Sequence, residues 1–233
     1  MSIKENLEII KNRIKQVVKD PSEIELVAVT KSAGVNQIIE AINSGITNIG
    51  ENRIQEAKGK FDQLKKMEIK WHMIGHLQRN KVKEAIKIFD MIQSVDRLEL
   101  AKEIEEQAGQ INKIMDVLIE VNVSNEETKF GVSPVATLEL IQEIAKLNNI
   151  RIKGLMTIAP LVLNPEDTRP YFRALVNLRD EIVHQQIENV EMKYLSMGMS
   201  NDFEVALEEG ANMIRIGRAI FCKSSYSATE GHR

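Results

Sequence analysis

Apolar residues change their spacing repeatedly along this chain, between the period of a helix and the continuous runs of a buried strand. The first segment has apolar residues at every third or fourth position, which predicts an amphipathic helix that ends before Pro21. These residues are Ile3, Leu7, Ile10, Ile14 and Val17. From Pro21 to Phe221, short β-branched runs then alternate with segments of helical period.

Eight short apolar runs have the length and composition of strands. They are Glu25–Lys31, Asn48–Asn52, Trp71–Gly75, Met91–Asp96, Asp116–Val123, Arg151–Ile158, Tyr194–Gly198 and Met213–Phe221. The segments between them have helical spacing, and several end at glycine, a common residue just beyond a helix. They are Val35–Gly45, Arg53–Lys66, a helix that begins near Arg79, Arg97–Gly109, Pro134–Leu147, Asp167–Gln186 and Asn201–Gly210.

This alternation predicts an α/β fold, and eight repeats favour a single-domain, closed (β/α)8 TIM-type barrel with an extra N-terminal helix. The strand runs are apolar almost throughout, as in parallel strands that are buried on both faces. A doubly wound open sheet is the second possibility. No linker or change of composition divides the chain, so we assign residues 1–222 to the barrel and residues 223–233 to a polar C-terminal tail.

Composition excludes several classes of partner. A net charge of −3 and 4% aromatic residues over 233 residues give no basis for nucleic-acid binding. No apolar run is long enough to span a membrane, and the charged N-terminus lacks the apolar centre of a signal peptide. The single cysteine, Cys222, fits a reducing compartment, so we expect a cytoplasmic protein.

In barrels of this type, the chemistry occurs at the C-terminal ends of the strands. The residues expected there are Lys31, Glu51, Asn52, Arg53, His76, Asp96, Asn122, Ser124, Met156, Thr157, Ser196, Gly198, Ser200, Arg215, Gly217 and Arg218. Their spacing matches neither a metal site nor a P-loop, so we expect no metal and no nucleotide hydrolysis.

Lys31 follows the first strand in the stretch AVTKSAG. A lysine held against apolar neighbours has a lowered pKa, and its free amine can form a Schiff base with a carbonyl compound. The alternative is a lysine at a strand end that simply extends its ammonium group into solvent.

The last two strands are followed by SMGMSN, which contains Ser196 and Ser200, and RIGRA, which contains Gly217 and Arg218. Glycine permits close approach of a ligand to the backbone, and barrels of this type often bind phosphate at these two loops. Arg215 places a permanent cation within an apolar strand and needs a partner, which in a purely structural role would be Glu51 or Glu120. A Schiff-base lysine together with a phosphate site suggests pyridoxal 5′-phosphate (PLP).

Longer motifs strengthen this suggestion. The chain contains VAVTK, GENRIQEA, WHMIGHLQRNK, IQSVDR, EVNVSNEETKFG, IKGLMTIAP and YLSMGMSNDFEVALEEGANMIRIGRAIF. In this order and spacing, over about residues 1–222, they resemble the PLP homeostasis proteins of the YggS/PROSC family. That family has the fold of the alanine racemase N-terminal barrel, which is fold type III among PLP proteins.

The resemblance implies a role for each cofactor-binding residue. Lys31 is expected to carry PLP as an aldimine, with Asn52 beside the cofactor and Arg215 facing the pyridine nitrogen. Ser196 and the backbone at Gly217 and Arg218 are expected to hold the phosphate, and Ser200 is included with this loop. Three positions depart from the pattern: Arg218 replaces a common threonine or serine, Cys222 replaces glycine, and Arg53 replaces an aromatic residue of some members.

The resemblance favours a PLP carrier in vitamin B6 and amino-acid homeostasis over an enzyme. Arginine cannot accept a proton from the pyridine nitrogen at neutral pH, so the ring would stabilise carbanions weakly. The second domain that supplies a base in racemases is not recognisable in this chain, which also favours a monomer. PLP-dependent apoenzymes are possible partners. A low-activity PLP racemase or lyase and an aldolase that uses Lys31 on a phosphorylated sugar remain as alternatives.

Overall fold

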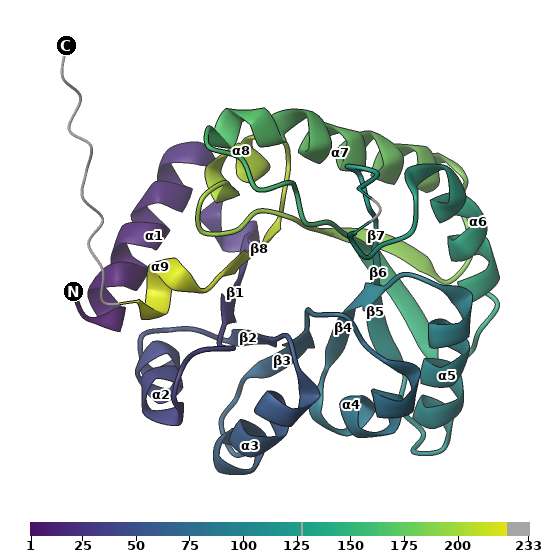
Figure 1. The fold of residues 1–233 in the computed structure, drawn as a ribbon, viewed down its shortest axis with the longest axis horizontal. Coiled ribbons are helices and arrows are strands. Elements are labelled where there is room, and N and C mark those ends of the chain that lie inside the picture. Colours follow the sequence, from purple (N-terminus) through teal and green to yellow (C-terminus); the bar gives the residue numbers. More distant parts are fainter. Residues whose placement is uncertain (127, 223–233) are drawn as a thin grey trace.

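A computed structural model describes residues 1–126 and 128–222, which form a closed parallel barrel in the strand order β1 to β8 (Figure 1). The strands are β1 (Glu25–Val29), β2 (Asn48–Glu51), β3 (Lys70–Met73), β4 (Met91–Val95), β5 (Met115–Glu120), β6 (Ile150–Met156), β7 (Val190–Ser196) and β8 (Met213–Ile216). The predicted (β/α)8 barrel is confirmed, and the open-sheet alternative is wrong because β8 pairs with β1.

Helices surround the barrel, as Figure 1 shows. They are α1 (Ile3–Val17), α2 (Val35–Asn43), α3 (Ile54–Leu64), α4 (Val82–Ile88), α5 (Leu98–Gly109), α6 (Pro134–Ile144), α7 (Arg169–His184), α8 (Phe203–Glu208) and α9 (Arg218–Phe221). Three 3₁₀ segments precede β1, α4 and α7: η1 (Pro21–Glu23), η2 (Arg79–Lys81) and η3 (Pro165–Thr168). Within the described residues, no helix is both long and apolar enough to cross a membrane.

Most of the strands end earlier than the apolar pattern predicts, and the last run shows why. The predicted strand Met213–Phe221 is wrong beyond Ile216, because Gly217 leaves the ladder and the chain turns into α9. Apolar side chains continue through this change because α9 buries Ala219, Ile220 and Phe221 against the barrel. An apolar run of this kind does not distinguish a strand from a buried helical turn.

Two separate apolar clusters hold the barrel together. The smaller cluster lies in the barrel interior and contains Val27, Met91, Leu118, Met156 and Met213 from five different strands. The larger cluster fills the space between the strands and the surrounding helices. The remaining interior space is occupied by polar side chains, and these connect to the candidate site.

The N-terminal helix completes the outer layer of the barrel. The helix after β8 has only four residues, and α1 lies beside it, between α8 and α2 (Figure 1). Asn6 donates to the carbonyl of Ile220 at 2.9 Å, and Arg13 makes two hydrogen bonds to the carboxylate of Glu204 on α8. Helix α1 therefore covers the part of the barrel that a longer helix after β8 would otherwise cover.

We expect Leu7→Ala to destabilise the protein by about 2–5 kcal/mol, because Leu7 is fully buried between α1 and the barrel and its truncation leaves a cavity. Urea unfolding followed by circular dichroism measures the change. The matched variant on the exposed face of the same helix, Glu8→Ala, should stay within about 0.5 kcal/mol of wild type. A loss of under about 1 kcal/mol for Leu7→Ala would show that α1 is dispensable for the barrel.

Candidate cofactor site at the C-terminal mouth of the barrel

Lys31 lies at the C-terminal mouth of the barrel, in a turn two residues beyond the end of β1. Its side chain is exposed and makes no hydrogen bond or ion pair with the described residues. The expectation that apolar neighbours enclose this lysine is therefore wrong, because β1 ends at Val29 and the buried residue is Thr30. The structure presents Lys31 as an accessible amine at the mouth.

A buried hydrogen-bond cluster holds the backbone immediately before Lys31. The ammonium group of Lys60, on α3, donates to the Thr30 carbonyl at 2.6 Å and to Glu51 Oε1 at 2.7 Å. The Thr30 hydroxyl donates to the same carboxylate oxygen, and Glu51 is fully buried. Sequence reasoning missed Lys60, since a lysine on a surface helix gives no sign that it reaches into a strand end.

Asn52 follows β2 at the same mouth and is half-buried. Its side-chain oxygen Oδ1 is buried and has no hydrogen-bond partner among the described residues. The loop after β3 presses closely on it, because a Cβ on Gly75 would lie 2.4 Å from the Asn52 carbonyl oxygen. The structure thus brings Asn52 to the mouth with an unused acceptor, which is a feature of a ligand site.

The loops after β7 and β8 meet at the N-terminus of α9. The Ser200 hydroxyl accepts a long hydrogen bond of 3.4 Å from the Ala219 amide. The amides of Gly217 and Arg218 donate to no group in the described part of the chain. Since Gly217 is the N-cap and has no side chain, these first amides of α9 remain open. Such a set of donors suits an anion.

Arg218 makes one side-chain hydrogen bond in the described part of the chain. Its side chain is exposed, and its guanidinium lies 3.5 Å from Asn201 Oδ1. Of the other two departures from the family pattern, Arg53 is exposed and weakly paired with Glu56 at 3.8 Å. The third, Cys222, is an exposed free thiol.

Arg215 lies inside the barrel and is 4% exposed. It donates to the Ser196 hydroxyl at 2.7 Å and to the Thr157 carbonyl at 2.8 Å. Burial lowers the pKa of the guanidinium to about 10, against the opposing effect of the Glu120 and Asp202 carboxyls, so it remains a cation at neutral pH. The alternative ion pair with Glu51 or Glu120 is wrong: Glu51 pairs with Lys60, and no ion pair joins Arg215 to Glu120 in the described residues.

Ser196 occupies a different place from the one expected of a phosphate ligand. It is fully buried, its hydroxyl donates to Gln93 Oε1 at 2.6 Å, and its oxygen accepts from Arg215. Because Gln93 belongs to β4 and Ser196 to β7, this bond crosses the barrel interior. The Ser196 hydroxyl proton is thus hydrogen-bonded to Gln93 inside the barrel. The serine that lies beside the open amides is Ser200.

The opposite part of the mouth is acidic. Glu120, at the end of β5, is 6% exposed, and burial together with Asp96 raises its pKa to about 7, while Arg215 opposes that shift. Burial lowers the pKa of the neighbouring His76, whose ring stacks on Phe130 at a centroid distance of 3.9 Å. Sequence reasoning missed this stack, because Phe130 follows its strand by ten residues and gives no pattern of its own.

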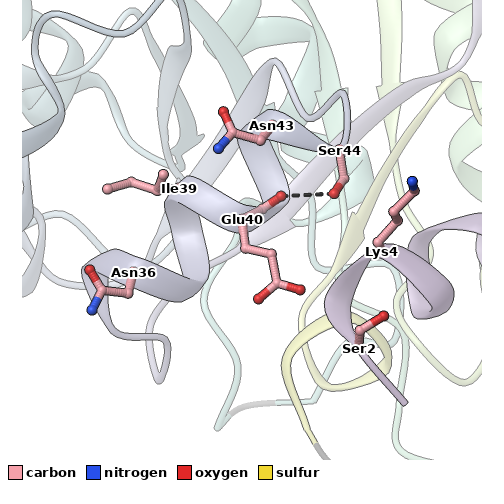
Figure 2. A pocket seen from close by; sticks show the side chains of 7 residues that line it. All are labelled: Ser2, Lys4, Asn36, Ile39, Glu40, Asn43 and Ser44. Carbon is pink, nitrogen blue, oxygen red and sulfur yellow. Dashed lines mark hydrogen bonds between the residues drawn. The ribbon is translucent and has the colours of Figure 1, made fainter.

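A separate hollow of about 660 Å³ lies between α1 and α2 (Figure 2). Its lining residues are Ser2, Lys4, Asn36, Ile39, Glu40, Asn43 and Ser44. Glu40 accepts from the Ile3 amide at 3.2 Å and so joins the two helices, whereas the Ser44 hydroxyl donates to the Glu40 carbonyl at the end of α2 itself. None of the expected cofactor residues lines this hollow.

Comparison with known proteins agrees with this fold. Residues 2–225 match the family described as alanine racemase, N-terminal domain. A pyridoxal phosphate homeostasis protein of Aquifex aeolicus (strain VF5) is 48% identical over 202 residues, covering 87% of this chain and 88% of the relative. The structure of PipY from Synechococcus elongatus PCC7942 with PLP bound is 32% identical with a TM-score of 0.84, covering 94% of this chain and all of that one.

The alanine racemase of Clostridium difficile 630 shares the fold, with a TM-score of 0.74, at 17% identity over 98% of this chain and 59% of that chain. The barrel and its mouth therefore define a protein of the alanine racemase N-terminal class. Within this class, the chain belongs to the family of pyridoxal phosphate homeostasis proteins. The resemblance found in the sequence motifs is confirmed.

The raised pKa of Glu120 predicts a specific pH dependence of stability. A carboxyl whose folded-state pKa is raised from 4.5 to about 7 stabilises the fold below pH 4.5, and this contribution is lost as the pH rises through 7. Glu120→Gln keeps the neutral form at every pH. Its free energy of unfolding relative to wild type should therefore rise by about 2–3 kcal/mol between pH 4.5 and pH 8.

Urea unfolding of the PLP-free protein at both pH values gives the comparison. The control is Glu106→Gln, at an exposed position on α5, whose difference from wild type should stay constant. A constant difference for Glu120→Gln as well would mean that folding does not raise the pKa of Glu120.

Proposed function

We propose that this chain binds PLP at the C-terminal mouth of its barrel, with covalent attachment to Lys31, and acts as a PLP-binding homeostasis protein. The observation that carries the proposal is that one mouth combines an accessible lysine amine, open backbone amides and a buried arginine. PLP supplies an aldehyde that condenses reversibly with a primary amine and releases water. Among the relatives, PipY has been solved with PLP bound.

The residues present fit the cofactor. A phosphate dianion needs several donors, and the amides of Gly217 and Arg218 and the hydroxyl of Ser200 are placed together without competing acceptors. The free Oδ1 of Asn52 offers an acceptor beside the cofactor. Arg215 supplies a fixed cation beside the ring, where the family resemblance expects the pyridine nitrogen.

The same residues favour binding over turnover. Arg215 remains a cation at neutral pH and has no lone pair for a proton, so it cannot hold the pyridine nitrogen in its protonated form. We therefore propose that the protein stores or delivers PLP, with PLP-dependent apoenzymes as candidate recipients. A monomeric state remains a prediction of the sequence.

We expect borohydride reduction of the PLP-loaded protein to place a stable pyridoxyl label on Lys31, because its amine is accessible and lacks an internal partner. Tryptic mapping by mass spectrometry locates the label. Lys31→Arg keeps the charge, cannot form the imine and should carry no label at this peptide. A label mainly on another lysine of PLP-saturated wild type would overturn the assignment.

We expect the side chain of Arg218 to contribute little to PLP affinity. An exposed arginine–phosphate pair is screened by water and contributes roughly 0–1 kcal/mol, whereas a hydrogen bond to a charged group contributes roughly 1.5–3 kcal/mol. Arg218→Thr should therefore change the Kd by less than about tenfold, which corresponds to about 1.4 kcal/mol, and Ser200→Ala should weaken binding more.

Equilibrium PLP titration of both variants at two salt concentrations separates the contributions. A large, salt-sensitive loss for Arg218→Thr, with Ser200→Ala unchanged, would show that the guanidinium is the main phosphate anchor.

A further inference from the structure

A chain of side-chain hydrogen bonds crosses the barrel interior from the mouth to the N-terminal end of β1. It begins with Arg215 Nη1 donating to Ser196 Oγ at 2.7 Å, and continues from Ser196 Oγ to Gln93 Oε1 at 2.6 Å. Gln93 Nε2 then contacts His72 Nδ1 at 2.9 Å. His72 Nε2 contacts Asn48 Oδ1 at 3.2 Å, and Asn48 Nδ2 donates to Glu25 Oε2 at 2.8 Å.

In every hydrogen bond of this chain, the donor lies on the Arg215 side and the acceptor lies on the Glu25 side. Guanidinium and amide nitrogens only donate, so His72 must accept at Nδ1 and carry its proton on Nε2, which donates to Asn48. The second amide hydrogen of Gln93 is directed to Met213 Sδ at 3.2 Å, which fixes the orientation of the amide. The chain therefore starts at a cation and ends at a carboxylate, with no reversal between them.

This uniform direction has an energetic consequence. Hydrogen bonds in series polarise one another in a medium of low dielectric constant, and charged ends add to the effect. His72 is 2% exposed, and burial with the nearby Lys70 lowers its pKa to about 3, so the imidazole stays neutral as the chain requires. The amides of Asn48 and Gln93 do not exchange protons along the chain, so it orients groups and is not a proton wire.

At the mouth, the hydrogen-bond chain determines the orientation of the Ser196 hydroxyl toward Arg215. Because Gln93 accepts the hydroxyl proton, the oxygen of Ser196 presents a lone pair to the guanidinium. The Thr157 carbonyl holds the other terminal nitrogen at 2.8 Å. The remaining guanidinium N–H groups make no hydrogen bond with the described residues and are available to a ligand in the mouth.

We propose that Gln93, His72, Asn48 and Glu25 are positioning residues for the cofactor, which orient Arg215 against the ring of PLP through Ser196. The inference rests on the proposed PLP site, but it assigns a role to residues that lie outside that site. It also makes Glu25, at the opposite end of β1 from Lys31, part of the control of the cofactor.

Two pairs of variants test the proposal in the full-length protein. Glu25→Gln removes the terminal anion of the hydrogen-bond chain at a half-buried position. Glu23→Gln is its control, because it removes the same charge from an exposed residue two positions earlier. Gln93→Met interrupts the chain with an apolar side chain of similar length. Thr137→Val is its control and removes a hydrogen bond from the buried Thr137 side chain on α6 to the carbonyl of Ser133, the N-cap of that helix.

The first measurement is the visible absorption spectrum and the Kd for PLP of each loaded variant. Gln93→Met should shift the absorption maximum and weaken PLP binding by roughly tenfold, about 1.4 kcal/mol. Glu25→Gln should shift the maximum in the same direction, with a smaller effect on the Kd. Both controls should keep the wild-type spectrum and bind PLP within about twofold. The proposal would be overturned if Glu25→Gln and Gln93→Met are both folded and both have the wild-type absorption maximum and Kd for PLP.

The second measurement needs no PLP. The ¹⁵N chemical shifts of the His72 imidazole in the free protein should show a neutral ring with the proton on Nε2, and Gln93→Met should change them. A proton on Nδ1 in wild type would refute the direction of the chain and with it the proposal. If the wild-type protein binds no PLP, the proposed function is wrong. The His72 chemical shifts still show whether the hydrogen-bond chain has the direction described.

Discussion

The burial of the Arg215 guanidinium inside a closed barrel is the constraint on which much of the structure depends. A buried charge is costly unless it is hydrogen-bonded, and the apolar interior cluster offers no acceptor. Ser196 and Thr157 supply acceptors for the two terminal nitrogens of Arg215, and the Ser196 hydroxyl in turn donates to Gln93. The polar residues of four further strands follow from this requirement, which explains why a barrel core contains histidine, glutamine and asparagine.

The outer layer follows a different requirement, which is to cover β8 and β1. Residues 217–222 are used to end β8 and to expose two amides, so they form only the short helix α9. Helix α1 covers the exposed strands from the other end of the sequence, and its contacts with α8 and α9 are polar at Arg13 and Asn6. The loop with the open amides and the N-terminal helix are thus two parts of one arrangement.

Eight apolar runs that alternate with helical segments favour the barrel, but a doubly wound open sheet gives the same alternation, and the pairing of β8 with β1 distinguishes the two. The position of Lys31 and of the last two loops at the mouth can also be predicted, because they follow the C-terminal ends of predicted strands. The interior network does not, because Gln93 and Ser196 are far apart in sequence and meet only across the closed barrel. The family resemblance implies a phosphate role for Ser196, whose sequence neighbours are the loop residues, but its hydrogen-bond partners in space are Gln93 and Arg215.

The direction of the interior chain agrees with the chemistry of the mouth. Its cationic end lies beside the loops whose amides of Gly217 and Arg218 are open, and its anionic end lies at the start of β1. The cationic end of the hydrogen-bond chain and the open amides of α9 therefore lie on the same side of the mouth, at the end of β8. The carboxyls of Asp96 and Glu120 occupy the part of the mouth formed by β4 and β5, where a pKa of about 7 leaves Glu120 partly protonated at neutral pH. In the proposed PLP site, a phosphate dianion would therefore be held at β7 and β8, away from these carboxyls, and the Lys31 amine would remain free for the aldehyde.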